Sequence, residues 1–262
     1  LFEYTGGVGP RYYIGGIDVH RGKDWIVRDN EFRHIRSPAG SLAEHAIHFW
    51  NHSRNTLVER NRIITCDRGI GFGLGSSPHT GGIIRNNTIF HDGSPGFNDV
   101  GIGLESSPGT KVVNNTIFLS QAYPNAIEYR FFATQDVLIA NNLVGGRIQA
   151  RDGALADLAT NLSGAQAHWF KDSLEGDLHL AFAVPQVTGQ GTALLDLEDD
   201  MDGEIRPLED GVDIGADEWF GCLADHDMDH DVDGLDLFFL IHEKTLDCLG
   251  VFAGRFGRCP PL

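Results

Sequence analysis

An asparagine-containing turn recurs at a nearly constant spacing through residues 29–142. The five turns are Asp29-Asn30, Arg60-Asn61, Asn86-Asn87, Asn114-Asn115 and Asn141-Asn142. Their second residues lie 31, 26, 28 and 27 positions apart, which is the period expected of stacked structural repeats. Because each repeat in such an array contacts only its neighbours, this period decides the fold class of the chain.

Two kinds of β-prone run accompany the turns. The runs that precede each turn are residues 25–27, 56–58, 82–84, 111–113 and 137–139. The runs further upstream, in which every second residue is apolar, are 17–20, 47–50, 70–73, 102–105, 127–130 and 148–151. No 3.6-residue periodicity lies between them, which excludes leucine-rich repeats and helical solenoids. The pattern predicts an all-β solenoid with two or three strands per coil, in which the asparagines tolerate left-handed backbone and bond to one another between coils.

Over residues 12–165 this pattern resembles the right-handed parallel β-helix repeat proteins of the pectin-lyase-like superfamily. Residues 176–180, 202–207 and 212–218 look like the C-terminal closing segment of many bacterial secreted β-helix proteins. The resemblance implies a protein that is secreted or exposed on a bacterial cell surface. It does not choose among lyase, hydrolase, epimerase and non-catalytic members, because fold analogy cannot make that choice.

The negative charge of the chain is concentrated near its C-terminus. The formal net charge is −17, but residues 1–195 carry 18 acidic and 16 basic side chains, whereas residues 196–236 carry 17 acidic and one basic. A nearly neutral body without a basic stripe argues against nucleic-acid binding. No apolar run approaches the roughly 20 residues of a membrane span. Because the chain begins at Leu1 without a signal-peptide pattern, we expect a processed product or a fragment, with further coils before it.

The alternating runs predict the position of a site. With a side-chain period of two, their apolar residues face inward and the intervening residues form two outward columns. The first column is Asp18, His48, Gly71, Gly103, Glu128 and Gln149, and the second is His20, Trp50, Gly73, Glu105, Arg130 and Arg151. Glycines between flanking ionisable and aromatic side chains predict a groove with a flat floor, in which a polysaccharide could lie.

The residue types in these columns favour lyase chemistry on a uronate-containing polysaccharide. The catalytic candidates are His48, Glu105, Glu128 and Arg130, and the substrate-binding candidates are Asp18, His20, Trp50 and Arg151. An arginine would bind the uronate carboxylate and acidify the neighbouring C–H, while His48 or His20 would accept the proton. Trp50 would stack on a sugar face.

Two alternatives to a lyase remain open. Glu105 and Glu128 are one pair of carboxylates that a glycoside hydrolase could use, and their separation would set retention or inversion. The second alternative is that the charged residues are solvent-exposed ion pairs, such as Glu105 with Arg130, on a non-catalytic module for glycan binding or surface assembly. Glu44, His45, Asp67, Arg68 and Asp99 lie just upstream on the same coils and favour a site, although His45 and Asp67 are more typical of turns.

A calcium loop is predicted near the C-terminus. Residues 225–236 place aspartates at positions 1, 3, 5, 7, 9 and 12 of a twelve-residue loop, and apolar residues 237–241 follow. Oxygen ligands on alternate residues suit Ca²⁺. The proposed ligands are Asp225, Asp227, Asp229, Asp231 and Asp236. The segment resembles a single dockerin-type repeat with a flanking helix, although His230 replaces the usual loop glycine and no second repeat follows, which weakens the expectation of a cohesin-like partner.

The four cysteines divide between the body of the chain and its C-terminal segment. Cys66 lies in an apolar stretch and is expected to be a small buried side chain. Cys222, Cys248 and Cys259 can form one disulfide in the C-terminal segment, with the pairing left open. The predicted organisation is therefore β-helix coils over 1–165, a closing segment over 166–220 and a dockerin-like segment over 221–262.

Overall fold

The computed structural model describes residues 1–93, 98–119, 123–195, 197–206 and 211–219, and beyond these only Gly234, Leu237, Phe238 and Ile241. The chain divides into two compact units, Leu1–Trp219 and Phe220–Leu262. The four described residues of the second unit are helical. The predicted calcium ligands and the three C-terminal cysteines lie outside the described residues, so the dockerin-like segment stays a prediction. Among the described residues no helix is both long and apolar enough to cross a membrane.

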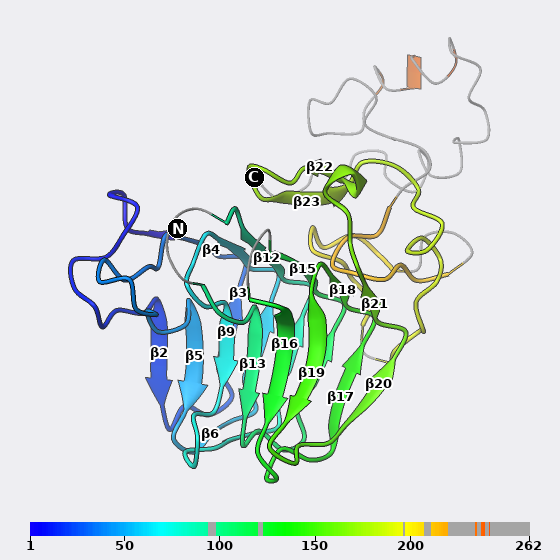
Figure 1. Ribbon diagram of the computed structural model, residues 1–262. Coiled ribbons are helices and arrows are strands. Elements are labelled where there is room, and N and C mark those ends of the chain that lie inside the picture. The colour runs from blue at the N-terminus through cyan, green and yellow to red at the C-terminus, as the bar shows by residue number, and fades with distance from the viewer. Residues whose placement is uncertain are drawn as a thin grey trace. The chain divides into compact units, whose positions relative to one another are not determined.

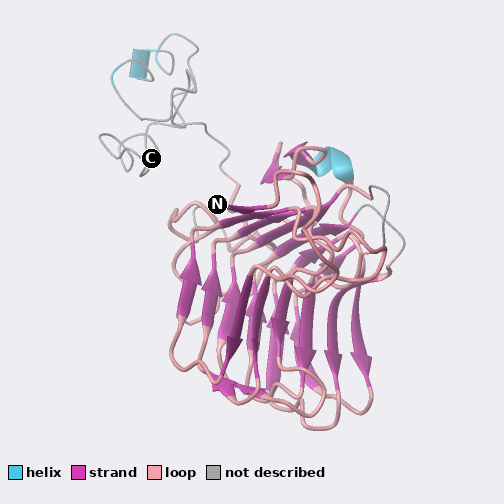
Figure 2. Cartoon of the chain, turned by 90° about the vertical axis from the view of Figure 1, so that its left-hand side faces the viewer, coloured by secondary structure: helices cyan, strands magenta, loops and turns pink. Residues whose placement is uncertain are grey.

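Three parallel sheets form the first unit (Figures 1 and 2). The front sheet contains β2 (Ile17–His20), β5 (Ile47–Trp50), β9 (Ile70–Phe72), β13 (Ile102–Glu105), β16 (Asn125–Arg130) and β19 (Arg147–Arg151). The side sheet contains β3 (Ile26–Arg28), β7 (Leu57–Glu59), β11 (Ile83–Arg85), β14 (Lys111–Val113), β17 (Val137–Ala140) and β20 (Ala156–Ala159). The top sheet contains β1 (Phe2–Glu3), β4 (Glu31–Arg33), β8 (Arg62–Ile64), β12 (Thr88–His91), β15 (Thr116–Leu119), β18 (Leu143–Val144) and β21 (Leu162–Ser163).

Each coil contributes one strand to each of the three sheets, which confirms the predicted parallel β-solenoid. The chain passes from the front sheet to the side sheet, turns at an asparagine and enters the top sheet. Short strands β6 (Ser53–Arg54) and β10 (His79–Thr80) pair between the front and side sheets of two neighbouring coils. The third strand per coil follows the asparagine turn.

The core is a stack of identical or similar apolar side chains. On the front sheet Ile47 aligns with Ile70 and then with Ile102 and Ile127, and Phe49 aligns with Phe72. These side chains are fully buried. Every second residue of a strand points to the same side, so the intervening positions are held on the outer face. A slip of one residue would expose the whole stack, and the register of the outer columns is therefore fixed by the core.

The second asparagine of each turn forms a buried ladder. The Nδ2 of Asn87 donates to the Oδ1 of Asn115 at 2.9 Å, and Asn115 donates in the same way to Asn142 at 2.9 Å. Asn61 continues the ladder on one side and Asn161 on the other. The sequence spacing did not reveal Asn161, because it lies only 19 positions after Asn142 and follows a threonine.

Two properties expected of a single asparagine, left-handed backbone and hydrogen bonding between coils, belong to two neighbouring residues in the structure. Left-handed backbone occurs at the residue before the ladder asparagine: φ is 53° at Asn86, 50° at Asn114 and 54° at Asn141. Arg60 and Thr160 take the same conformation, with φ of 51° and 48°. The ladder residue needs an amide with a donor and an acceptor, whereas the preceding residue only has to accept positive φ. That explains why the first position varies and the second does not.

The described residues between 166 and 219 include a segment that packs on the top sheet. They begin with a one-turn 3₁₀ helix η1 (Ala167–Trp169) and the antiparallel strands β22 (Phe170–Asp172) and β23 (Asp177–Leu180). A second core cluster forms where Phe170, Leu178 and Leu180 meet Phe90 and Leu143 of the coils.

The end of this segment is anchored by an internal ion pair and by the coils. Arg206 is fully buried beside Glu218 and donates to the carbonyls of Gly215 and Ala216. Asn114 also donates to the Gly215 carbonyl, at 3.2 Å. A Cβ at Gly215 would lie 2.8 Å from Thr116 Oγ1, so the close approach requires glycine. Asp200 accepts from the backbone N–H groups of residues 202 and 204, which closes a turn at Asp200-Met201-Asp202-Gly203.

Cys66 is a small buried side chain, as the sequence predicted. It is 6% exposed and free. Burial raises the pKa of its thiol to about 12, so it remains protonated and unreactive at neutral pH.

Candidate functional site

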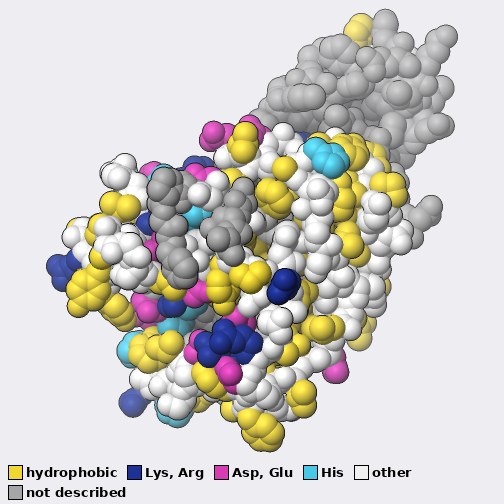
Figure 3. All heavy atoms as spheres, in the orientation of Figure 1, with side chains coloured by type: hydrophobic (Ala, Val, Ile, Leu, Met, Phe, Trp, Pro, Cys, Tyr) yellow, Lys and Arg dark blue, Asp and Glu magenta, His cyan; other side chains and the backbone are white. Residues whose placement is uncertain are grey.

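The outward residues of the front sheet align in the two predicted columns. One column reads Asp18, His48, Gly71, Gly103, Glu128 and Gln149. In the other, His20 aligns with Trp50, and Glu105 aligns with Arg130 and Arg151. Figure 3 shows histidine, arginine and acidic side chains gathered on this face. The structure therefore brings the predicted residues onto one surface, while their catalytic and binding roles stay predictions.

The loop that leads into β5 and the strand itself supply a cluster of three ionisable residues: Glu44 and His45 from the loop, and His48 from β5. Asp67 of the next coil holds this loop in place. One oxygen of its carboxylate accepts the backbone N–H of Ser37 at 2.8 Å and that of Ala43 at 2.9 Å. Asp67, expected from the sequence to be a turn residue, thus positions Ala43, the residue before Glu44.

The atoms of this cluster face one another without forming hydrogen bonds. Glu44 Oε2 lies 3.0 Å from His48 Nδ1 and 3.8 Å from His45 Nδ1. All three atoms are buried without a hydrogen-bond partner among the described residues. Burial lowers the pKa of His45 to about 4, so its ring is neutral at pH 7.

His48, the predicted general base, is fully buried. Its Nε2 lies 3.1 Å from the carbonyl oxygen of Gly73, and the indole of Trp50 stacks on its ring with centroids 5.6 Å apart. Trp50 donates its Nε1–H to Asp18 at 2.8 Å, and the exposed His20 contacts its ring edge-on at 4.2 Å. This end of the face therefore presents aromatic surface, with His48 beneath it.

The expected flat glycine floor is wrong at its centre, because His45 covers it. A Cβ added at Gly71 would lie 2.7 Å from the His45 ring. At Gly103 the nearest atoms would be Val100 Cγ1 at 3.3 Å and His45 Nε2 at 3.6 Å. Glycine at position 71 thus makes room for an imidazole that reaches from the neighbouring coil. Residue spacing could not show this, since His45 lies outside the strand.

Arginines and carboxylates form the other end of the face. Arg130 lies 2.9 Å from Asp152, 3.6 Å from Glu105 and 3.7 Å from Glu128. Arg151 lies 3.0 Å from Glu128 Oε1. The ion pair predicted between Glu105 and Arg130 is therefore present as part of a larger network. At about 4.8 Å per coil, Glu128 lies about 14 Å along the sheet from His48, too far for direct contact.

Two residues of this network were missed by the sequence analysis. Tyr123 donates its hydroxyl hydrogen to Glu128 Oε2 at 2.8 Å, and Asn125 donates to the same oxygen at 2.7 Å. Burial and the neighbouring carboxylate raise the pKa of Tyr123 to about 12. The available signal was their position immediately before the run that contains Glu128. Glu128 is only 5% exposed, and both of its oxygens are engaged.

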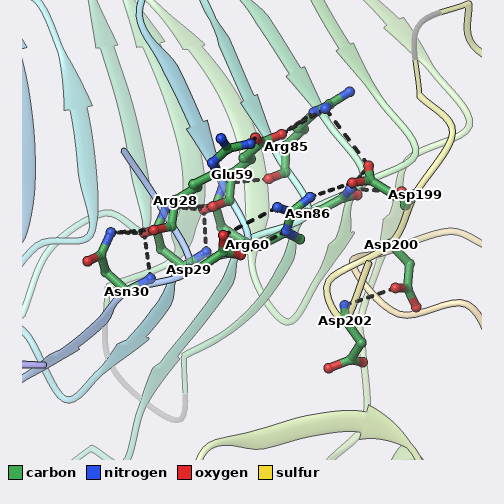
Figure 4. Close-up of polar contacts among 12 residues, drawn as sticks. Arg28, Asp29, Asn30, Glu59, Arg60, Arg85, Asn86, Asp199, Asp200 and Asp202 are labelled. Carbon is green, nitrogen blue, oxygen red and sulfur yellow. Dashed lines mark hydrogen bonds and ion pairs between the residues drawn. The ribbon is translucent and has the colours of Figure 1, made fainter. Parts of the chain in front are cut away.

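A second charged region lies on the side sheet (Figure 4). Glu59 lies between Arg28 and Arg85 of the adjacent coils, at 3.5 and 2.7 Å. Arg60 pairs with Asp29 at 2.8 Å and also with Asp199 of the segment that packs on the coils. These charges pair with one another across coils and hold the closing segment, so we assign them a structural role.

A hollow of about 220 Å³ opens beside this region and includes His179 and Asp202. His179 lies between Asp177 and Asp202, the latter at 3.0 Å. Although burial opposes the charged form, the hydrogen bonds to these two carboxylates raise the pKa of His179 to about 10. Each nitrogen of this imidazolium already has an acceptor, which is the arrangement of a stabilising charged contact.

Comparison with protein families identifies the coils. Residues 14–146, about half of the chain, match the family described as a right handed beta helix region. The chain belongs to this right-handed beta helix family. The resemblance stated from the asparagine turns is thereby confirmed for the fold, which is common to carbohydrate-active proteins. Searches of curated proteins and of solved structures found no significant match. Family membership shows no specific activity, so the function must be argued from the site.

Proposed function

We propose that this right-handed beta helix protein acts on an extracellular polysaccharide that contains uronate, by β-elimination on the outer face of the front sheet. The observation that carries the proposal is the placement of a neutral imidazole, that of His45, over Gly71 and Gly103, one coil from the arginine and carboxylate network. A proton acceptor and a carboxylate-binding guanidinium are the two groups that elimination from a uronate requires.

In this proposal the uronate lies over Gly103. Arg130 and Arg151 bind its carboxylate, which stabilises negative charge as the C5 proton is removed. His45 Nε2 takes that proton, the electron pair forms the C4=C5 double bond, and the C4–O4 bond breaks. A bound carboxylate also favours the imidazolium form of His45, so the substrate strengthens a base that burial has weakened. His48, which with His20 was one of the two bases expected from the sequence, instead contacts the ring of His45, with centroids 4.7 Å apart.

The departing oxygen needs a proton, and Tyr123 is placed to supply it. With a pKa raised to about 12 its hydroxyl is protonated at neutral pH. Glu128 and Asn125 fix its position through the shared carboxylate oxygen. Glu128 is thus a positioning residue in this mechanism. The aromatic pair of Trp50 and His20 would contact a sugar ring further along the chain of the polysaccharide.

One observation favours a second candidate, the non-catalytic glycan-binding or surface-assembly module. The Arg130 guanidinium already lies within 4 Å of three carboxylates, those of Glu105, Glu128 and Asp152. A cation held in this way is partly neutralised and would bind a uronate weakly. The glycoside hydrolase alternative uses Glu105 and Glu128, but Glu128 would first have to release its hydroxyl, amide and guanidinium partners.

A polysaccharide panel distinguishes these candidates. Each polysaccharide is incubated with the full chain, and absorbance of an unsaturated uronate, new reducing ends and retention in affinity electrophoresis are recorded. Elimination predicts absorbance and reducing ends together. Reducing ends without absorbance indicate hydrolysis, and retention without either indicates a binding module. No signal in all three assays rejects the proposed function.

A variant pair then tests the assigned proton donor. Tyr123→Phe removes the hydroxyl and should lower the elimination rate by at least tenfold, whereas Tyr12→Phe, at an exposed tyrosine of the same chain, should leave it unchanged. Equal rates for both variants would remove Tyr123 from the mechanism.

We also propose the remaining sequence-based assignments. A secreted or cell-surface location on a bacterium fits a polysaccharide substrate. The aspartates of residues 225–236 have the spacing of Ca²⁺ ligands, and the similarity to a dockerin repeat supports a cohesin-like or other surface partner for this segment. Nucleic acid is not proposed as a partner, because the coils carry almost no net charge.

A further inference from the structure

The Glu44, His45 and His48 cluster has a property that the elimination reaction does not use. His48 Nδ1, His45 Nδ1 and Glu44 Oε2 are buried and lack hydrogen-bond partners among the described residues. One possible ligand atom from each of the three residues lies within 4.8 Å of the other two. The side chain of His48 is 0% exposed and that of His45 is 9% exposed. Burying three such atoms without partners is unfavourable unless something binds between them.

The contact of His48 with the backbone indicates which kind of ligand would bind between these three atoms. Its Nε2 faces the Gly73 carbonyl oxygen at 3.1 Å, so Nε2 carries the ring hydrogen. In the neutral ring Nδ1 then has a lone pair, and this lone pair faces a carboxylate oxygen at 3.0 Å. Two acceptors at this distance repel each other unless a cation lies between them. A histidine that binds a metal through one nitrogen commonly donates its other N–H to a carbonyl.

We propose that Glu44, His45 and His48 bind one divalent transition-metal ion of the Zn²⁺ type. Tetrahedral zinc with ligands at about 2.1 Å separates its ligand atoms by about 3.4 Å. The separations of 3.0 and 3.8 Å from Glu44 Oε2 lie on either side of that value. Two imidazoles and one carboxylate favour zinc and its neighbours over Ca²⁺ or Mg²⁺, which prefer oxygen ligands.

Asp18 adds a further oxygen at the edge of the cluster. Its Oδ1 lies 3.7 Å from His48 Nδ1 and accepts the Trp50 indole N–H at 2.8 Å. It is placed to complete the coordination or to accept a hydrogen bond from a metal-bound water. A metal ion binds the lone pair of a neutral imidazole.

The ion would also regulate the proposed elimination, a consequence that rests on the proposed function. When His45 Nδ1 binds the metal, its Nε2 carries the ring hydrogen and no longer accepts the C5 proton of a uronate. Zinc would then inhibit elimination. Metal binding itself does not depend on this activity and is tested without it.

The test compares metal content and fluorescence of the full chain with those of three variants. Equilibrium dialysis against Zn²⁺ or Co²⁺ should show one equivalent fewer in Glu44→Gln than in the wild-type chain. His52→Gln, at an exposed histidine outside the cluster, should retain the wild-type number. Because all variants keep the acidic C-terminal segment, ions bound there cancel in the comparison. Co²⁺ should also quench Trp50, whose ring lies 5.6 Å from that of His48, and Trp50→Phe should lose this quenching while retaining the ion.

The folded state of each variant is checked by circular dichroism and thermal unfolding. Added Zn²⁺ should raise the melting temperature of the wild-type chain more than that of Glu44→Gln, because the ion binds the folded site. Equal metal content in the wild-type chain and a folded Glu44→Gln variant would overturn the proposal. Absence of Trp50 quenching would also overturn the proposal.

Discussion

Replacing Asn115 by alanine measures how much one rung of the asparagine ladder stabilises the coils. Asn115 is fully buried. Its amide nitrogen donates to three oxygens at 2.9–3.1 Å, and its amide oxygen accepts from two nitrogens of Asn87 at 2.9 and 3.1 Å. The substitution removes all five hydrogen bonds and leaves buried backbone groups without a partner.

The expected loss follows from this count. At about 1 kcal/mol net for each hydrogen bond, Asn115→Ala lowers the free energy of unfolding by about 5 kcal/mol. For a unit of this size, that corresponds to a fall in melting temperature of about 10–20 °C. The position also couples three successive coils, so the loss affects both interfaces rather than one repeat alone.

Asn30→Ala is the matched control. Asn30 begins the ladder, is partly exposed, and its side chain makes two hydrogen bonds, to Arg28 and Asn61. The same calculation gives about 2 kcal/mol, less than half the effect of Asn115→Ala. Both variants are unfolded by urea and by heat under identical conditions. Equal destabilisation of the two variants would refute the argument that the ladder hydrogen bonds, and not the turn itself, stabilise the stack.

Three further predictions concern other parts of the chain. Gly71→Ala places a methyl group 2.7 Å from the His45 ring and should cost about 1–3 kcal/mol, whereas the closest contact of Gly103→Ala is a side-chain methyl of Val100 at 3.3 Å, which needs only a small shift and should cost less; urea unfolding of both variants checks this. Burial lowers the pKa of His79 to about 3, so the folded state binds fewer protons, and stability should fall as the pH drops below about 6.5. His79→Gln should make urea midpoints measured between pH 7 and pH 5 less dependent on pH, and an unchanged slope would contradict this. Calcium titration calorimetry should show binding to the wild-type chain that Asp236→Ala weakens at least tenfold, and no heat with the wild-type chain would reject the calcium loop.

The architecture was predictable because it depends on short-range patterns that repeat. Each coil has the same alternation of inward and outward residues, so the run that contains Ile47 and the run that contains Ile102 predict the same sheet and the same register. The asparagine turns mark the corner between the side and top sheets. Only Asn161 escaped, since the last coil is shorter and a threonine precedes the asparagine.

The candidate site was predictable only in part. Alignment of Asp18, His48, Glu128 and the arginines followed from the register, since residues at equivalent positions of successive coils must lie side by side. The position of His45 did not follow, because it belongs to the loop before β5, where no alternation constrains the direction of a side chain. A signal was present in the histidines at positions 45 and 48 and in the glycines at positions 71 and 103. Relating the histidines to the glycines requires the tertiary structure, because the ring of His45 reaches across to the neighbouring coil.

The sequence by itself therefore determined the repeat, the sheet register and the surface on which ionisable residues gather. Tertiary structure decided which of those residues touch. It buried His48 beneath Trp50 and placed the ring of His45 over Gly71. It also placed the hydroxyl group of Tyr123, which precedes β16, against the carboxylate of Glu128. The physical reason is that strand register is fixed by backbone hydrogen bonds and a stacked core, whereas loop side chains are positioned by contacts, such as those of Asp67, between residues far apart in the chain.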